Sequence, residues 1–315
     1  MKNRFEVSTE GMAELQSGRE PWQLAKELIS NAWDERTTLC DVTLEHKTGR
    51  KSELIVQDDG DGFSKIEDVW TLMGHTPKRA NPNARGRFNL GDKEILSVAV
   101  EATIRTAGKI ICFPKEGGRT VTADPIPQKG TVFSCILPWT KRQVEETVTM
   151  LKTLLPPRNI LYRVNGEAIR YQKPDTVTEY TLETQLSPDG PGSPLRYTHR
   201  KSAIEITKNG GTGTLFEMGI PIQPIGCPYK VNVMQKVPMP PNRDVVRDSY
   251  LRDIYSAVLI ATINDLKYGE TGETWVRIAV GNKDMPKDVV REVLEKRYGD
   301  KVMLWSSDPK ANEKA

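Results

Sequence analysis

The stretch of sequence that decides the fold is Glu27-Leu28-Ile29-Ser30-Asn31-Ala32-Trp33-Asp34-Glu35. Pro21 precedes it, and a helix can begin at a proline without losing a hydrogen bond, so we expect a helix from Pro21 onward. At about 100° per residue, Glu27, Asn31 and Asp34 fall within an arc of roughly 60°. This polar stripe is either solvated surface or one wall of a binding site. The apolar residues recur at helical spacing on the opposite side: Trp22, Ala25, Leu28, Ile29 and Ala32.

The composition is that of an ordinary globular protein. The 315 residues suffice for two domains; 37% are apolar and 28% are charged, and the mean hydropathy is −0.51. A net charge of +3 gives no indication of nucleic-acid binding. The sequence has no apolar run of membrane-spanning length and no secretory signal, so we expect a cytoplasmic protein without a membrane partner. The four cysteines form no C-x-x-C pair, which gives no indication of zinc or a disulfide framework.

A second motif follows an expected strand, Glu53–Gln57. The chain runs straight into Asp58-Asp59-Gly60-Asp61-Gly62, which leaves a carboxylate at the edge of the sheet. Two glycines follow that are free to take unusual backbone angles. The alternatives are a tight acidic turn or half of a calcium loop, although the glutamate that would end a calcium loop is missing.

A basic, glycine-bearing loop comes next. Residues 74–88 have few apolar anchors, so we expect them to be mobile. Gly86 and Gly91 flank the start of a helix expected over Asp92–Ala99. Such a loop suits anions, because free N–H groups and the helix dipole point toward the ligand, but ordinary surface loops have a similar composition. Its basic residues are Lys78, Arg79, Arg85 and Arg87.

The other elements predict an α+β domain over residues 1–170 and a second domain over residues 171–270. Asn209–Gly213 favours a hairpin turn over a phosphate loop, because no helix follows. Residues 271–315 begin a further α/β unit without completing it. In the first domain we expect helices over Lys65–Met73 and Lys141–Leu155, strands over residues 99–107, 109–114 and 130–137, and a hairpin over Tyr162–Ile169.

Taken in order, these motifs resemble those of the gyrase, heat-shock chaperone, histidine kinase and MutL (GHKL) superfamily of ATPases. They are E-x-x-x-N-x-x-D on a helix, D-x-G-x-G after a strand, a glycine-flanked lid, and Gly130-Thr131 opening a late strand. The resemblance covers about residues 5–170. It implies a Bergerat-type α/β sandwich, with helices on one face of a mainly antiparallel mixed sheet, followed by a transducer-like α/β domain. The chain has no P-loop, so phosphate would be held by the lid.

The resemblance implies ATP and Mg²⁺ as ligands of the polar stripe. Glu27 would be the general base that polarises the attacking water. Asn31 would give its amide oxygen to Mg²⁺, which bridges the phosphates. Asp34 would help to hold the nucleotide or its waters.

At the base end, the resemblance implies that Asp58 accepts a hydrogen bond from the adenine amino group. Gly60 and Gly62 would let the backbone approach the purine closely. Thr131 would support Asp58 and a water at the adenine.

Gly86 and Gly91 would form the phosphate lid, with Lys93 as a phosphate contact. The family's lid commonly has the pattern G-x-x-G-x-G, whereas here Asn89 replaces the middle glycine. Asn tolerates left-handed backbone angles better than most residues. Closure of this lid is therefore expected to matter more for ATP turnover than for ATP binding.

In the transducer domains of the family a basic residue reaches the γ-phosphate. Lys236 and Arg243 are the candidates here, and the alternative is ordinary surface charge. The segments Ser8–Met12, Gln235–Pro238 and Asn242–Asp244 are also similar to phage rapid-lysis IIA-like ATP-binding proteins.

Three functions are consistent with these motifs. The first is an ATP-hydrolysing conformational switch, with an ATP-dependent homodimer and an unknown protein client as expected partners. The second is a histidine kinase, which needs an acceptor histidine on a dimerisation helix. His46, His75 and His199 instead fall in an expected strand, the lid and a loop. The third is a nucleotide-sensing module that does not hydrolyse ATP, which Asn89 favours.

Overall fold

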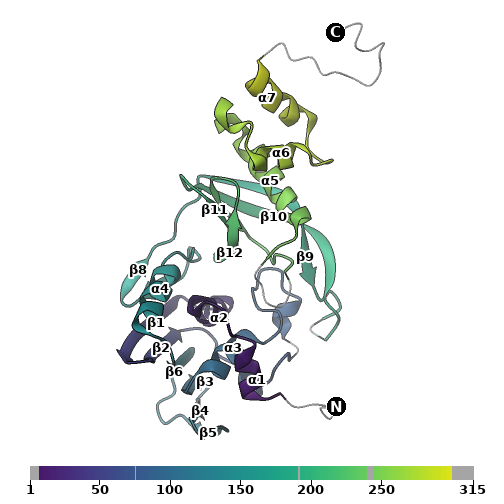
Figure 1. Cartoon of the computed structure of the whole chain (residues 1–315). Coiled ribbons are helices and arrows are strands. Elements are labelled where there is room, and N and C mark those ends of the chain that lie inside the picture. The colour runs from purple at the N-terminus through teal and green to yellow at the C-terminus, as the bar shows by residue number, and fades with distance from the viewer. Residues whose placement is uncertain (1–6, 75, 191, 240–244, 300–315) are drawn as a thin grey trace. The chain divides into compact units, whose positions relative to one another are not determined.

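The structure is a computed structural model, and it describes residues 7–74, 76–190, 192–239 and 245–299. The chain divides into two compact units (Figure 1). Unit 1 consists of Met1–Lys173, Gln185–Tyr197 and Glu217–Pro221. Unit 2 consists of Pro174–Thr184, Thr198–Phe216 and Ile222–Ala315.

Unit 1 contains a layer of helices and a mixed sheet. Its helices are α1 (Thr9–Glu14), α2 (Pro21–Asp34), α3 (Gly91–Val98) and α4 (Lys141–Leu151), with 3-10 turns at Ile66–Val69 and Pro77–Arg79. Its strands are β1 (Leu39–Thr48), β2 (Lys51–Asp58), β3 (Glu101–Thr106), β4 (Lys109–Phe113), β5 (Thr120–Ala123), β6 (Thr131–Leu137), β7 (Leu161–Val164) and β8 (Glu167–Ile169). In the described chain these strands pair in the order β5-β4-β3-β6-β2-β1-β7-β8. Only the β1–β7 pair is parallel, which confirms the predicted sandwich with a mainly antiparallel mixed sheet.

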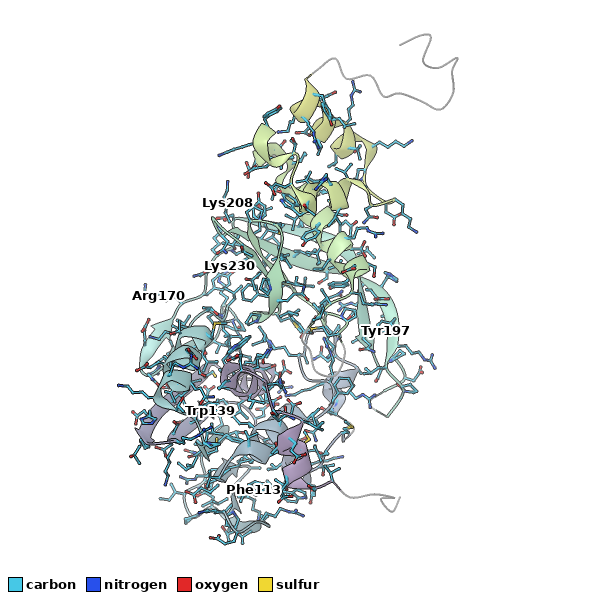
Figure 2. All side chains as sticks on the ribbon, viewed as in Figure 1. Phe113, Trp139, Arg170, Tyr197, Lys208 and Lys230 are labelled. Atoms are coloured by element: carbon cyan, nitrogen blue, oxygen red, sulfur yellow. The ribbon has the colours of Figure 1, made fainter. Side chains whose placement is uncertain are left out.

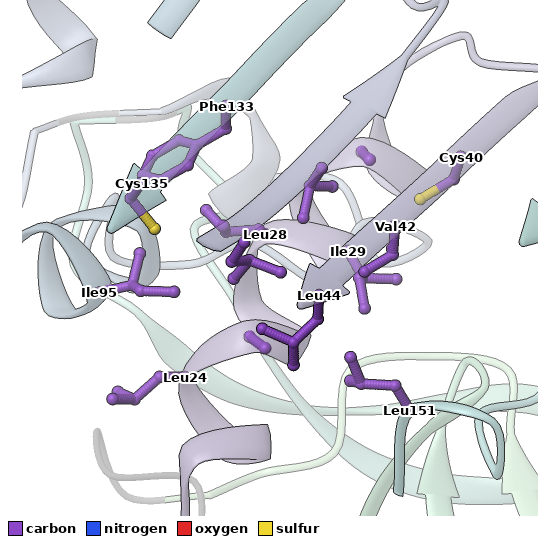
Figure 3. Packing of buried hydrophobic residues seen from close by; sticks show 14 of the residues in the cluster. Leu24, Leu28, Ile29, Cys40, Val42, Leu44, Ile95, Phe133, Cys135 and Leu151 are labelled. Atoms are coloured by element: carbon purple, nitrogen blue, oxygen red, sulfur yellow. The ribbon is translucent and has the colours of Figure 1, made fainter. Parts of the chain in front are cut away.

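Alternation of buried residues explains why the helices cover one face of this sheet. Every second residue is buried in β2, in β1 as far as Leu44 and in β6 from Phe133 onward, and these side chains point to the same face. Figure 3 shows them packing against apolar side chains of α2, α3 and α4. The contacting residues include Val42, Leu44, Phe133 and Cys135 on the strands and Leu24, Leu28, Ile29, Ile95 and Leu151 on the helices.

The helix expected over Lys65–Met73 is wrong, because only Ile66–Val69 forms a short 3-10 turn. The amide of Asn89 donates to the carbonyls of Asp68 (3.3 Å) and Thr71 (2.8 Å), and Lys93 also donates to the carbonyl of Asp68. Side chains from elsewhere in the sequence therefore use carbonyls that an α-helix would need for its own hydrogen bonds.

Unit 2 is built on a second sheet. The strands β9 (Thr176–Leu186), β10 (Arg196–Lys208), β11 (Gly213–Glu217), β12 (Ile220–Ile225) and β13 (Tyr229–Val233) pair, in the described chain, in the order β12-β11-β13-β10-β9. Its helices are α5 (Asp248–Thr262), α6 (Thr274–Val280) and α7 (Lys287–Tyr298), with 3-10 turns at Ile263–Asp265 and Tyr268–Glu270. Trp275 of α6 packs edge-on against Tyr229 of β13, with ring centroids 6.2 Å apart. None of the helices described is long and apolar enough to cross a membrane.

Two expectations for unit 2 are wrong. Asn209–Gly213 does not close a hairpin, because β10 pairs antiparallel with β13 and not with β11. Lys208 and Lys230, labelled in Figure 2, lie at the paired ends of β10 and β13. The α/β unit expected from residue 271 contains only helical elements up to residue 299. Its remaining residues, 300–315, lie outside the described chain.

Candidate functional site

The polar stripe of α2 is not solvated surface. Pro21 occupies the first turn of the helix, and a capping box between Glu20 and Gln23 fixes its start. Glu27 is only 6% exposed, and the side chain of Asp34 is fully buried. Burying a charged carboxylate costs free energy unless hydrogen bonds or opposite charges compensate for the lost water.

The lid ends against Glu27. Gly91 is the first residue of α3, and a Cβ built on it would lie 2.6 Å from Oε2 and 2.8 Å from Cβ of Glu27. No side chain fits in this gap without moving one of the two helices. Glycine at position 91 therefore lets the start of α3 lie directly on the glutamate expected to act as general base.

Asp34 holds the beginning of the same lid. Its carboxylate accepts hydrogen bonds from the backbone N–H groups of Arg85 (2.9 Å) and Gly86 (2.8 Å) and from the Arg85 guanidinium (3.1 Å). Burial alone would raise the pKa of Asp34, but the charges of Lys78 and Arg85 and the two N–H groups lower it below its ordinary value. The carboxylate that we expected to contact the nucleotide is occupied by the lid instead.

Lys78 connects the lid to the end of α2. Its ammonium lies 2.9 Å from Glu35 and 3.8 Å from Asp34. Burial would lower the pKa of Lys78, but the two carboxylates raise it, so the lysine stays charged. A Cβ on Gly86 would come within 2.8 Å of this side chain. A side chain at position 86 would therefore require Lys78 to move.

Asp58 lies at the end of β2, on the helix-covered face, because it follows the alternation of buried Leu54 and Val56. Its Oδ1 accepts hydrogen bonds from the N–H groups of Gly60 (2.9 Å) and Thr131 (3.3 Å). Its Oδ2 accepts none from the residues that the structure describes. Burial raises the pKa of Asp58 to about 6, although the two N–H groups oppose the shift. This buried carboxylate therefore keeps one oxygen for a donor outside the described chain.

The predicted residues around Asp58 are brought together. Thr131 lies next to Asp58 because β2 and β6 pair, with Gln57 opposite Val132. Gly62 has a φ of +72°, which favours glycine. A Cβ on Gly60 would lie 2.7 Å from that of Glu35, so the loop also packs closely against the end of α2.

Two further residues support Asp58: Thr106, which the sequence analysis missed, and Gly130, which was part of the Gly130-Thr131 motif but was given no role. Thr106 accepts the N–H of Phe63 (3.1 Å), and its hydroxyl lies 3.1 Å from that of Thr131. Gly130 has a φ of +83°, and a Cβ there would lie 2.0 Å from the carbonyl oxygen of Asp58. The sequence signal for Gly130 was its place directly before Thr131. Thr106 could not be found without the pairing of β3 with β6.

The first turn of α3, directly after the lid, differs from expectation at Lys93. Its ammonium donates to Asp92 (2.8 Å), to the side-chain oxygen of Asn89 (2.9 Å) and to the carbonyl of Asp68. It is directed into the protein, so the phosphate contact expected of Lys93 is not what its geometry favours. Asn89 has a φ of +50°, in the left-handed region that the missing glycine would have used.

The basic residues of the lid are also paired within the protein. Lys78 and Arg85 bind acidic groups of α2, and Arg87 is fully buried in an ion pair with Glu217. The basic composition that suggested an anion site thus includes three side chains with carboxylate partners inside the protein.

Of the two basic candidates after residue 171, Lys236 is fully buried in unit 2, which excludes ordinary surface charge. Its backbone carbonyl accepts a hydrogen bond from the Thr184 hydroxyl (2.8 Å). Arg243 lies outside the described residues. The γ-phosphate role of both remains a prediction.

Asn31 is the residue best suited to a metal. Its side chain is half-buried on α2, between Glu27 and Asp34 in the stripe, and makes no hydrogen bond to any residue described here. No group of three His, Cys, Asp or Glu side chains in the described chain is arranged to hold a metal ion. A single amide oxygen fits Mg²⁺ that is bound together with substrate phosphates.

The mixed sheet is covered by helices, one helix carries an asparagine in its polar stripe, a buried aspartate ends a strand, and a glycine-flanked lid lies beside them. Together these features define an ATP-binding domain. Residues 20–116 match the family model of histidine kinase-, DNA gyrase B-, and HSP90-like ATPases. In this part, the chain is therefore similar to the GHKL superfamily of ATPases. No curated protein matches the sequence. The narrower resemblance to phage proteins remains a prediction.

Solved structures with similar folds include the ATPase region of Saccharomyces cerevisiae topoisomerase II, with 14% identity and a TM-score of 0.43 over 64% of this chain and 61% of that one. The same region bound to ICRF-187 (dexrazoxane) has 13% identity and a TM-score of 0.42 over 64% and 62%. The N-terminal domain of a DNA repair protein has 13% identity and a TM-score of 0.46 over 76% and 91%. This chain thus spans less than two thirds of the topoisomerase chains.

Proposed function

We propose that this protein binds Mg-ATP, hydrolyses it slowly and acts as a nucleotide-gated conformational switch. One observation carries the proposal: α2 contacts all three other parts of the site. Glu27 contacts Gly91 at the end of the lid, Asp34 binds Gly86 at its beginning, and Glu35 packs on Gly60 in the loop after β2. An extended nucleotide can therefore lie along α2, with its base near Asp58 and its phosphates near Glu27.

In this arrangement the adenine amino group donates to Oδ2 of Asp58, the carboxylate oxygen that accepts no hydrogen bond in the described chain. Gly60 and Thr131 hold the other oxygen and so fix the orientation of the carboxylate. The phosphates lie near the start of α3, where the N-cap residue Leu90 offers no side-chain cap and backbone N–H groups are available.

The hydrolytic step depends on Glu27. As general base, it accepts a proton from the attacking water, which Gly91 and α3 cover. Asn31 would hold Mg²⁺, which supplies charge stabilisation at the phosphates. Lys236 and Arg243 remain the candidates for the basic residue that contacts the γ-phosphate. The partners that we propose for the switch are a second copy of the chain, in an ATP-dependent homodimer, and an unknown protein client.

The test is phosphate release from ATP, measured as a function of protein concentration. We expect slow turnover whose specific activity rises with concentration, because association would stabilise the closed lid. ATP binding without phosphate release at any concentration would instead select a nucleotide-sensing module. That second candidate is favoured by Lys93, whose ammonium is occupied within the protein rather than directed toward a phosphate.

Asp58→Asn should weaken ATP binding about tenfold to hundredfold, because a hydrogen bond to a charged group is lost.

ATP affinity of the wild type should rise between pH 5 and 7 with a midpoint near 6, since the pKa of Asp58 is raised to about 6 and the ionised form is the better acceptor. Calorimetric titration with ATP across this range measures both effects. The pH dependence of folding stability has the opposite sign. Because the pKa of Asp58 in the folded protein lies above its ordinary value of 3.8, protonated Asp58 stabilises the fold at low pH, and this contribution is lost as pH rises through about 6.

Two variants are needed as references. The phosphate of the ligand itself titrates near pH 6, so the Asp58→Asn protein, which lacks the carboxyl group, gives the baseline. Asp124→Asn removes another buried carboxylate of unit 1, paired with Arg105 at 2.8 Å, and should leave ATP affinity unchanged. Equal pH dependence in Asp58→Asn and wild type would contradict the role of Asp58.

A further inference from the structure

The turn Glu217-Met218-Gly219-Ile220 joins β11 to β12, and it belongs to unit 1. Leu155 donates its N–H to the carbonyl of Gly219 (3.0 Å), and a Cβ on Gly219 would lie 2.1 Å from the carbonyl oxygen of Leu155. Ile220 is part of the core of unit 1. Met218 has a φ of +46°, which a non-glycine residue adopts only when its surroundings impose it. The turn is therefore held in one position.

The lid binds this turn through two arginines. The guanidinium of Arg85 donates to the carbonyl of Met218 (3.0 Å from Nε) and to Asp34 (3.1 Å), and it lies 5.3 Å from the ring centroid of Trp33 on α2. Arg87 forms an ion pair with Glu217, and both side chains are almost completely buried. The lid segment is thus fixed between α2 on one side and the turn on the other.

The position of these contacts in the chain connects them to the chemistry. Only three residues separate Arg87 from Gly91, which lies on Glu27. Between them, the amide of Asn89 bonds the carbonyl of Thr71 (2.8 Å). A buried ion pair is costly to desolvate and adds little stability of its own, so a role in fixing one lid geometry explains it better than stability does.

We propose that Arg85 and Arg87 are positioning residues, and that the Glu217–Ile220 turn is a functional part of the nucleotide lid. When bound nucleotide further reduces the fluctuations of the lid, the fluctuations of the turn are reduced with it, and so are those of strands β11 and β12, which continue from the turn. By linkage, loosening the turn must also loosen the nucleotide complex. This inference rests on the proposed function.

Hydrogen–deuterium exchange of the full chain tests the coupling, with and without a non-hydrolysable ATP analogue and Mg²⁺. In the wild type we expect the analogue to slow exchange in peptides covering residues 84–95 and residues 213–222. In Glu217→Gln, which keeps the shape of the side chain but removes the charge, slowing should persist at 84–95 and be lost at 213–222.

The outcomes separate the two proposals. Protection of the lid without any change at 213–222 in the wild type overturns this inference and leaves the proposed function standing. Absence of protection at both places, together with no ATP binding by calorimetry, overturns the proposed function and this inference with it. Thermal unfolding of each variant establishes that it is folded.

Kinetics provide a readout that a merely structural role would not change. Glu217→Gln and Arg87→Lys should each lower kcat about tenfold and change KM less than about threefold, and the double variant should be little worse than either. The Arg105–Asp124 pair is the control, because it is also an arginine–carboxylate ion pair of unit 1, with two hydrogen bonds (3.0 and 2.8 Å), but it joins Arg105 of β3 to the residue after β5 and not to the lid. Asp124→Asn should leave kcat unchanged, and equal losses of kcat at both pairs would overturn the positioning role.

Discussion

Glu27→Gln should abolish ATP hydrolysis while leaving ATP affinity within about threefold of the wild type. The substitution keeps the size of the side chain but removes the base, and general-base catalysis is worth about 10²- to 10⁴-fold. Glu27 is well placed for this role, since it is 6% exposed on a helix fixed by a capping box and the first residue of α3 lies against it. Phosphate release under saturating ATP measures the loss, and calorimetric titration measures the affinity.

A matched control is Glu53→Gln on β2. This glutamate also lies in unit 1 and is paired with Lys47 at 2.9 Å, but it is part of the sheet and has no contact with the lid. Turnover should be unchanged in Glu53→Gln. Turnover retained in Glu27→Gln would show that the base is another group, while a parallel loss of ATP affinity would show that Glu27 acts in binding.

The sequence predicted the parts of the site that depend on local patterns. The period of α2 placed Glu27 and Asn31 on one face, and the alternation of β2 carried Asp58 to the face that the helices cover. The period of α2 and the alternation of β2 needed only the spacing of neighbouring residues. The role of Thr131 was instead implied by the resemblance to GHKL ATPases, in which a Gly-Thr opens a late strand.

The partners of the lid could not be predicted in the same way. Arg85 binds Asp34, 51 residues earlier, and Arg87 binds Glu217, 130 residues later. A basic loop looks the same in sequence whether its charges face a phosphate or buried carboxylates. The partners of Lys93 could not be predicted for the same reason, because its acceptors include a carbonyl that is free only where the expected helix over Lys65–Met73 fails to form. Tertiary contacts thus decide the surroundings of both the lid and Lys93.

Gly91→Ala should lower kcat at least about tenfold with a smaller change in KM, because misplacement of a catalytic group by about 1 Å can cost far more than that. The added Cβ would lie 2.8 Å from Cβ of Glu27, and since that atom is fixed to the backbone of α2, α3 must shift. Alanine is the better helix former, so its local propensity would favour stability. Lower kcat with an undiminished melting temperature would therefore identify the contact, rather than the fold, as the cause.

The decisive comparison combines Gly91→Ala with Glu27→Gln. If the alanine acts by displacing Glu27, it should reduce turnover no further once the carboxylate is gone, since residues that act as a unit are not additive. Gly269→Ala, where a Cβ would meet nothing within 4 Å, controls for the methyl group itself and should be silent. Additive losses in the double variant would mean that Gly91 serves the phosphates independently of Glu27, and the lid would then contribute to catalysis through its backbone N–H groups alone.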